Sequence, residues 1–282
     1  MSVLAVRGAH LYYEVTGSGP VLLLIHGGYY DAESFADVSD QLADSFTVVR
    51  YDRRGASRSH LDGPPRHVSV QTQTEDARQL LSAIDAGSAY VFGTSWGALT
   101  ALTLTTQYPD MVRAVVAHEP QAVLLLPESD PRRAQVLELE NIYRQRGLQA
   151  AAQALMAAEG LGPGNQANEF ESRQAQARWD ANFERWRDNA EHFFGYLVTP
   201  GANYLPDFDI LGSPSMPATV VAVGQTSTGK LAHEAGLAVA ARLGRPAVTF
   251  PAGHNGYLTH PVAFASKLRG TLDPRQEGKL PS

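Results

Sequence analysis

Short runs of apolar residues recur along the chain, and most are separated by segments with the spacing of amphipathic helices. Val21–Ile25 is apolar throughout, which is typical of a strand buried on both faces of a parallel sheet. The same pattern predicts strands over residues 3–6, 11–15, 46–51, 90–92, 112–117, 219–223 and 247–250. Helices are predicted over residues 32–43, 70–84, 96–107, 230–243 and 261–272. This alternation favours right-handed βαβ units and an open, mostly parallel sheet.

The alternation stops between residues 121 and 204. That stretch is rich in Ala, Gln, Glu and Arg, has helical periodicity and contains no apolar run of the strand type. We therefore expect a helical cap over residues 121–204, inserted into one α/β core that residues 1–120 and 205–282 form. Aromatic residues recur in the cap at near-helical spacing, and they could line an apolar cleft or fill the interior of the cap.

The composition of the 282 residues is that of an ordinary globular protein, with 44% hydrophobic and 18% charged residues. The net charge of −6 argues against a nucleic-acid partner, because phosphate groups attract basic surfaces. No cysteine is present, which excludes disulfides, thiolate metal sites and cysteine nucleophiles. We expect a cytoplasmic protein without a membrane partner, since the first residues do not resemble a secretory signal and every apolar run is short.

The nucleophile of a hydrolytic reaction is predicted at Ser95. The sequence Gly93-Thr94-Ser95-Trp96-Gly97 joins an apolar run to a helical segment with the pattern Gly-x-Ser-x-Gly. A sharp strand-to-helix turn exposes the serine hydroxyl, and glycine avoids clashes on either side. The backbone N–H of Trp96 would then point to the place where an oxyanion develops. The pattern can also arise by chance, since Gly and Ser are common in turns, but its position between strand and helix favours the catalytic interpretation.

His254 is predicted to be the general base. Histidine suits this role because its pKa lies near neutrality. Of the nine histidines, His254 follows the last apolar run and lies in a turn flanked by glycines, whereas His26 is expected to have a structural role. His118, which precedes Glu119, is the main alternative, but the order serine, acid, histidine along the chain favours His254.

Three segments resemble the α/β-hydrolase family, and the resemblance covers nearly all of the chain outside the cap. His26-Gly27-Gly28 resembles the oxyanion loop of the family. Residues 51–59, YDRRGASRS, resemble its D-x-x-G-x-G-x-S turn, with Ala56-Ser57 where the second glycine is more usual. The segment around His254 resembles the one that carries the catalytic histidine.

This resemblance implies an α/β-hydrolase fold, in which a mostly parallel sheet is flanked by helices and carries an inserted helical cap. It also implies that Ser95 attacks a carbonyl carbon. Gly28 and Trp96 would supply the backbone N–H groups of the oxyanion hole, with Gly27 as the alternative to Gly28.

The acid of the triad departs from the usual pattern. The family commonly places it after the penultimate strand, but residues 210–233 contain neither Asp nor Glu. Glu119 follows the preceding strand, where the acid stands in certain haloalkane dehalogenases and in the zearalenone lactonases that the chain resembles. Glu119 is therefore predicted to orient His254, although it could instead cap a turn or pair with an arginine of the cap. Asp207 and Asp209 are the reserve candidates.

The substrate is predicted to be a carboxylic ester, in particular a lactone or a bulky apolar ester. The lactone is favoured by short matches to zearalenone lactonases, in the segments 55–59, 118–120 and 254–261. Substrate contacts are assigned to Tyr29, Trp186 and Tyr257. The serine disfavours dehalogenase and epoxide-hydrolase chemistry, for which the family uses aspartate.

Hydrolysis of carbon–carbon bonds and cofactor-free perhydrolysis use the same triad and remain alternatives, as does a non-catalytic ligand-binding protein. No metal-binding cluster or cofactor motif stands out in the sequence, so we expect a small-molecule substrate and no cofactor. A homo-oligomer is compatible with the sequence.

Overall fold

Nine strands form one sheet in the computed structural model, which describes residues 2–160 and 169–272. Their order is β1-β2-β4-β3-β6-β7-β8-β9, and β5 pairs with β2 beside this path. The strands are β1 (Ser2–Val6), β2 (Ala9–Thr16), β3 (Val21–Ile25), β4 (Thr47–Tyr51), β5 (His60–Leu61), β6 (Ala89–Thr94), β7 (Val112–His118), β8 (Ala218–Gly224) and β9 (Val248–Phe250).

The sheet is antiparallel at one end and parallel in the remainder. β2 runs antiparallel to β1, β4 and β5, whereas each neighbouring pair from β4 to β9 is parallel. In β3 the side chains alternate between two cores: Leu22 and Leu24 pack on one face, and Leu23 and Ile25 on the other. The mostly parallel sheet that the apolar runs predict is therefore confirmed.

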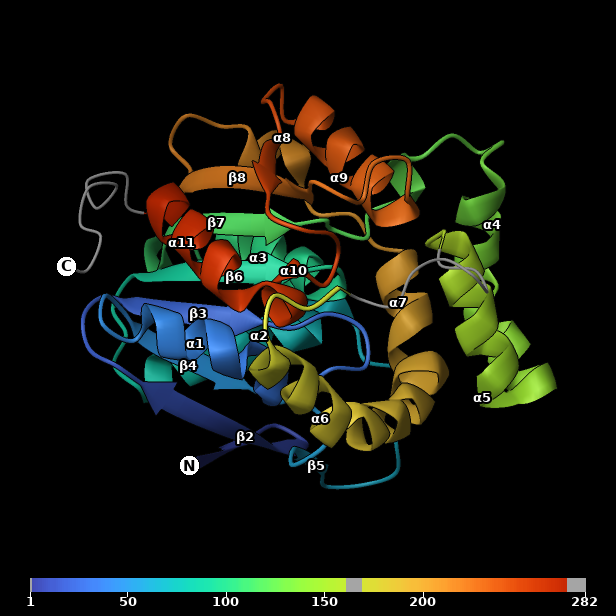
Figure 1. Ribbon diagram of the computed structural model, residues 1–282, viewed down its shortest axis with the longest axis horizontal. Helices are drawn as coiled ribbons and strands as arrows, with labels where there is room; N and C mark the ends of the chain where they lie inside the picture. Colours follow the sequence, from blue (N-terminus) through green and yellow to red (C-terminus); the bar gives the residue numbers. More distant parts are fainter. Residues whose placement is uncertain (1, 161–168, 273–282) are drawn as a thin grey trace.

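Helices cover both faces of this sheet (Figure 1). One core contains residues of α2 (Val70–Ala83), α3 (Trp96–Gln107) and α9 (Leu231–Arg242). The other contains residues of α1 (Ala36–Leu42) and α11 (Pro261–Leu272), which pack against each other. No helix in residues 2–160 and 169–272 combines the length and apolar character needed to cross a bilayer.

Only helices and loops occur in the described residues between β7 and β8. They are η3 (Val123–Leu125), α4 (Pro131–Leu137), α5 (Leu139–Ala158), α6 (Arg173–His192), η4 (Phe193–Leu197), α7 (Val198–Ala202) and α8 (Phe208–Leu211). Helices α4, α5 and α7 lie together beside one end of the sheet (Figure 1). Most of this helical region lies within the segment 121–204 assigned to a cap on sequence grounds, of which residues 161–168 lie outside the described residues.

Some predicted element boundaries need correction. The helix expected over residues 32–43 is divided into η1 (Ala32–Phe35) and α1, since Asp31 accepts a hydrogen bond from the N–H of Glu33 and begins a tighter turn. Strand β5 and helix α10 (Gly256–Thr259) were not predicted, because neither is long enough to show a periodic pattern. Three-residue η2 (Pro109–Met111) was missed for the same reason.

Asp31 joins the helical region to the core. Its buried carboxylate accepts hydrogen bonds from Arg185 Nε at 2.6 Å and Trp186 Nε1 at 2.9 Å, both on α6, and from Ser57 Oγ at 2.8 Å. Burial disfavours the charged carboxylate, but the hydrogen bonds from Arg185 and Trp186 outweigh this effect and lower the pKa of Asp31. Helix α6 is thus held against the loop that follows β3.

Candidate active site

Ser95 lies at the turn from β6 into α3. Its backbone has φ 56° and ψ −124°, a conformation that few non-glycine residues adopt. Glycine is required on both sides: a Cβ on Gly97 would lie 2.3 Å from the carbonyl oxygen of Ile25, and one on Gly93 would lie 2.6 Å from that of Gly97. The close approach of β6, α3 and the end of β3 therefore allows no side chain at either position.

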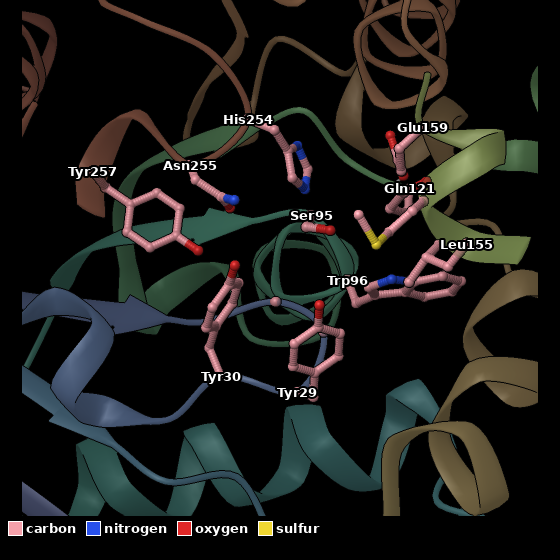
Figure 2. Close-up of a pocket in the computed structure, with 13 residues that line it drawn as sticks. Tyr29, Tyr30, Ser95, Trp96, Gln121, Leu155, Glu159, His254, Asn255 and Tyr257 are labelled. Atoms are coloured by element: carbon pink, nitrogen blue, oxygen red, sulfur yellow. Dashed lines mark hydrogen bonds between the residues drawn. The ribbon is translucent and has the colours of Figure 1, made fainter. Parts of the chain in front are cut away.

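His254 lies in the loop after β9, above Ser95 (Figure 2). Its Nδ1 is 2.7 Å from Oε2 of Glu119. Figure 2 shows the opposite side of the imidazole directed toward the hydroxyl of Ser95. With Nδ1 protonated and bonded to the carboxylate, Nε2 is left as the proton acceptor that a general base needs.

Glu119 follows the last residue of β7 and is completely buried. Its Oε1 accepts a hydrogen bond from the N–H of Gly224 at 2.8 Å, and its own N–H donates to the carbonyl of Ala222 at 2.8 Å. Both partners belong to β8, so the neighbouring parallel strand fixes the carboxyl group. Its φ of 44° turns the chain away from β7 directly after the strand.

The charges of Glu119 and His254 stabilise each other. Burial opposes ionisation of Glu119, but the hydrogen bond and the charge of His254 outweigh it and hold the pKa of the carboxyl well below its usual range. Burial likewise opposes protonation of His254, yet the hydrogen bond and charge of Glu119 raise the pKa of its imidazole. The pair is therefore suited to hold an imidazolium during a reaction.

The side chains of the alternatives for the acid, Asp207 and Asp209, and for the base, His118, make no hydrogen bond to Ser95 or His254 among the described residues. Asp207 caps α8 by accepting from the N–H groups of Asp209 and Ile210, and Asp209 is exposed and pairs with Arg242. His118 is fully buried, and desolvation lowers its pKa to about 4.

The predicted oxyanion loop lies against Ser95. A Cβ on Gly27 would lie 2.5 Å from the Cβ of Ser95, and Gly28 has φ 47° and lines the same cavity. The guanidinium of Arg53 donates to the carbonyl of Gly28 and fixes the loop. Trp96 is the first residue of α3, so its N–H has no carbonyl one turn earlier in the helix. Two backbone donors can therefore face Ser95, and Gly27 and Gly28 both remain candidates for the first.

His26 holds this loop and does not line the cavity. It is fully buried, its Nδ1 is 3.3 Å from the carbonyl oxygen of Gly27, and the N–H of Arg53 donates to its Nε2 at 3.3 Å. Burial, together with the charge of Arg53, lowers the pKa of His26 to about 3, so the ring is neutral.

A cavity of about 80 Å³ opens at Ser95 and His254 (Figure 2). The hydroxyl groups of Tyr29, Tyr30 and Tyr257 point toward the space around Ser95. The residues that line the cavity are Gly27, Gly28, Tyr29, Tyr30, Ser95, Trp96, Gln121, Leu155, Met156, Glu159, His254, Asn255 and Tyr257. Tyr29 and Tyr257, to which substrate contacts are assigned, therefore lie in the wall of the cavity at Ser95.

The substrate contact assigned to Trp186 needs correction. Trp186 does not line this cavity: it is 1% exposed, and its indole N–H donates to Asp31. The tryptophan packs the helical region onto the core. Helical spacing of aromatic residues alone could not distinguish packing from substrate contact.

Several lining residues were missed by the sequence analysis. Tyr30 follows Tyr29, and Gln121 lies two residues after Glu119, so their nearness in sequence to assigned residues was an available signal. Asn255 follows His254 in the same way. Glu159 is different: it reaches the cavity from the end of α5, and no motif in the sequence marks its position. No cluster of three or more metal-ligating side chains occurs among the residues that the structure describes.

Comparisons with known proteins give the same picture of the fold. A family model described as the alpha/beta hydrolase fold matches residues 20–261. The "Uncharacterized hydrolase YraK" of Bacillus subtilis is 31% identical over 279 residues, which are 97% of this chain and 96% of that protein. A "Zearalenone hydrolase" of Cladophialophora bantiana is 29% identical over 274 residues, 94% of this chain and 93% of that protein.

A solved structure with a similar fold is that of a thermophilic esterase from Thermogutta terrifontis. It superposes with a TM-score of 0.73 at 20% sequence identity, and the match covers 97% of this chain and 99% of the esterase. At that identity the superposition shows a shared fold, and nothing about the reaction follows from it.

Proposed function

The chain belongs to the α/β-hydrolase family, and on that premise we propose that it hydrolyses a carboxylic ester, preferably a lactone, through an acyl-enzyme on Ser95. The observation that carries the proposal is the 2.7 Å contact between His254 Nδ1 and Glu119 Oε2, with the far side of the imidazole directed at a serine in a strained turn. This arrangement supplies a nucleophile, a base and a group that orients the base.

Acylation begins when His254 Nε2 takes the proton of the Ser95 hydroxyl. The serine oxygen attacks the carbonyl carbon, and the negative charge that develops on the carbonyl oxygen faces the backbone N–H of Trp96 and that of Gly28 or Gly27. The carbon–oxygen bond to the alcohol then breaks. His254 gives its proton to the leaving oxygen, and the acyl group remains on Ser95.

Deacylation repeats these steps with water. His254 takes a proton from a water molecule, and the hydroxide oxygen attacks the acyl carbon. The bond to Ser95 breaks, the serine oxygen recovers its proton, and a carboxylic acid is released. In both halves Glu119 stabilises the imidazolium and keeps the proton of Nδ1 on the side away from Ser95.

A lactone is supported by the 29% identical relative named zearalenone hydrolase, whose match covers 94% of this chain. In a lactone the alcohol stays tethered to the acyl group after the first step, so water has to attack before the ring closes again. The cavity at Ser95 also borders His254, so a water molecule in it can reach the base.

The sequence analysis favours a lactone or a bulky apolar ester, whereas the cavity at Ser95 favours a smaller substrate. The cavity at Ser95, about 80 Å³, is smaller than the roughly 300–1,000 Å³ of usual ligand pockets. Many of its lining side chains carry polar groups, among them Tyr29, Gln121 and Glu159. We therefore propose a compact ester or lactone with polar groups of its own.

Ser95→Ala tests the proposal against a panel of small lactones and aryl esters. The variant removes one oxygen from a site where alanine fits, so the protein should fold and kcat should fall at least a thousandfold. Ser82→Ala, at an exposed position of α2, is the matched control and should keep the wild-type rate. A Ser95→Ala variant that hydrolyses the esters at more than about a hundredth of the wild-type rate would contradict the serine mechanism.

A further inference from the structure

A carboxyl group that the proposed mechanism does not use lies in the wall of the active-site cavity. Glu159 follows the last residue of α5, is 8% exposed, and lines the cavity that contains Ser95. Its Oε1 accepts a hydrogen bond from Gln121 Nε2, and its Oε2 accepts one from the N–H of Ala232 at 3.2 Å. Figure 2 shows Glu159 and Gln121 across Ser95 from Tyr257.

This pair has unused capacity to accept hydrogen bonds. Among the ion pairs of the described residues, none includes Glu159. Gln121 is 1% exposed, and its buried Oε1 has no hydrogen-bond partner in the part of the chain that the structure describes. A carboxylate can accept about four hydrogen bonds, and Glu159 accepts two from the protein. Buried acceptors of this kind are costly unless a ligand or water satisfies them.

We propose that Glu159 and Gln121 form a hydrogen-bond acceptor site for a hydroxyl group of the substrate, so that the enzyme prefers hydroxylated esters or lactones. The proposal rests on the proposed function, since it names the substrate class of the same cavity. The hydroxyl donates its hydrogen to a free lone pair of Glu159 or to Oε1 of Gln121. A substrate that lacks this hydroxyl leaves the acceptor atoms of Glu159 and Gln121 buried and without a partner. The enzyme therefore binds the deoxy analogue less well than the hydroxylated substrate.

A neutral hydroxyl fits this wall better than an ammonium group does. Leu155 and Met156 also line the cavity, and Figure 2 shows Leu155 and the indole of Trp96 on the same side of Ser95 as Glu159. Burial raises the pKa of Glu159, while the charge of His254 and the hydrogen bonds from Gln121 and Ala232 oppose this effect and favour the carboxylate. An ammonium group would have to give up its hydration among these apolar side chains, whereas a hydroxyl has less to lose.

A purely structural role for Glu159 makes a different prediction. Through Ala232, the second residue of α9, the carboxylate also bonds to a helix N-terminus, where negative charge is favoured. If joining α5 to α9 were its only role, replacing it would lower stability and slow every substrate equally. Only the acceptor site changes the ratio between a hydroxylated substrate and its deoxy analogue, so that ratio is the informative measurement.

The test compares γ-butyrolactones that carry a hydroxyl, methyl or ammonium substituent at the α or the β carbon of the ring. Hydroxyl and methyl are nearly equal in size, and each enzymatic kcat/KM is divided by the rate of alkaline hydrolysis to remove inductive effects. The wild type should prefer the hydroxylated lactone at one ring position by about tenfold or more. Glu159→Gln should reduce this ratio to within about twofold, while Glu184→Gln, at an exposed position of α6, should keep it.

Two results would overturn the acceptor site: a wild type with no more than a twofold hydroxyl preference at either position, or a stronger preference for the ammonium compound. The wild-type comparison stands even if Glu159→Gln does not fold. If no lactone or ester is hydrolysed, the proposed function fails, but the acceptor site is still tested by calorimetric binding of the same compounds to Ser95→Ala. Equal binding of hydroxyl and methyl compounds there would also overturn it.

Discussion

Glu119 has two neighbours that impose the same requirement on its two oxygens. Oε1 has to accept from the N–H of Gly224, and Oε2 has to accept from Nδ1 of His254. Only a carboxylate accepts at both atoms. The same carboxylate holds the proton of His254 on Nδ1, so one buried side chain sets both the position and the tautomer of the base.

Replacing Glu119 by Gln should therefore lower kcat by about a thousandfold or more, with little change in fold. The amide oxygen would accept from Gly224, which turns the NH₂ group toward Nδ1 and forces the proton of His254 onto Nε2. That nitrogen could then no longer take the proton of Ser95. The measurement is kcat for the best ester of the panel. Asp209→Asn, at an exposed ion pair, is the control; a loss of activity in Asp209→Asn with Glu119→Gln unaffected would refute the assignment of the acid.

The pH dependence of the reaction should report His254. Burial lowers its pKa, but Glu119 raises it by hydrogen bond and charge and Glu159 raises it further by charge, with a smaller opposing effect from Lys230. The net shift is upward, and the base works only when neutral. Activity should therefore be lost as pH falls through a value above the ordinary 6.5 of histidine.

A profile of kcat/KM from about pH 5 to about pH 9 measures this acid limb. Glu159→Gln removes one negative charge near the imidazole and should move the limb to lower pH. An acid limb below 6.5 in the wild type, or one that moves upward in Glu159→Gln, would contradict this electrostatic account.

Among the elements, the turn from β6 into α3 depends most on backbone packing. A Cβ on Gly97 or on Gly93 would lie 2.3 Å or 2.6 Å, respectively, from a backbone carbonyl oxygen, which is too close for any side chain. This turn was predictable from the sequence, because the apolar run, the two glycines, the serine and the helical segment follow one another directly in the chain. The short elements β5 and α10 were not predictable, since they depend on contacts with residues distant in the sequence.

Gly97→Ala should destabilise the protein. Its Cβ would lie 2.3 Å from the carbonyl oxygen of Ile25 and 2.4 Å from that of His26, so backbone would have to move, at a cost of about 3 kcal/mol or more. Gly63→Ala is the control, because no heavy atom lies within 4 Å of the added Cβ and φ there is not positive. Urea unfolding measures both variants. Equal midpoints for the two would show that the turn tolerates a side chain.

Across the whole molecule, the site is assembled from both halves of the core and from the helical region. Ser95, Glu119 and His254 were identifiable from sequence because parallel strands bring their carboxyl ends to one edge of the sheet. The part of the cavity wall that Leu155, Met156 and Glu159 form was not identifiable, because it depends on how α5 packs on the core. Glu159, directly after α5, reaches the cavity, whereas Trp186 of α6 does not.

Trp186→Phe tests the packing role of this tryptophan. Phenylalanine fills much of the same space but removes the hydrogen bond to the buried carboxylate of Asp31, which should lower the free energy of unfolding by about 1–3 kcal/mol. Trp179→Phe is the matched control, because the Trp179 indole makes no hydrogen bond among the described residues. Unchanged stability in Trp186→Phe, together with altered substrate preference, would return Trp186 to the substrate site.

The central claim, a covalent role for Ser95, is tested most directly by stoichiometric reaction with a small organophosphate such as diethyl 4-nitrophenyl phosphate. Intact-protein and peptide mass spectrometry locate the adduct, and residual ester hydrolysis is measured on the same samples. The account predicts one diethylphosphoryl group, on Ser95, and loss of activity in proportion to its occupancy. Full occupancy of Ser95 with retained hydrolysis, or full inactivation with Ser95 unmodified, would contradict it.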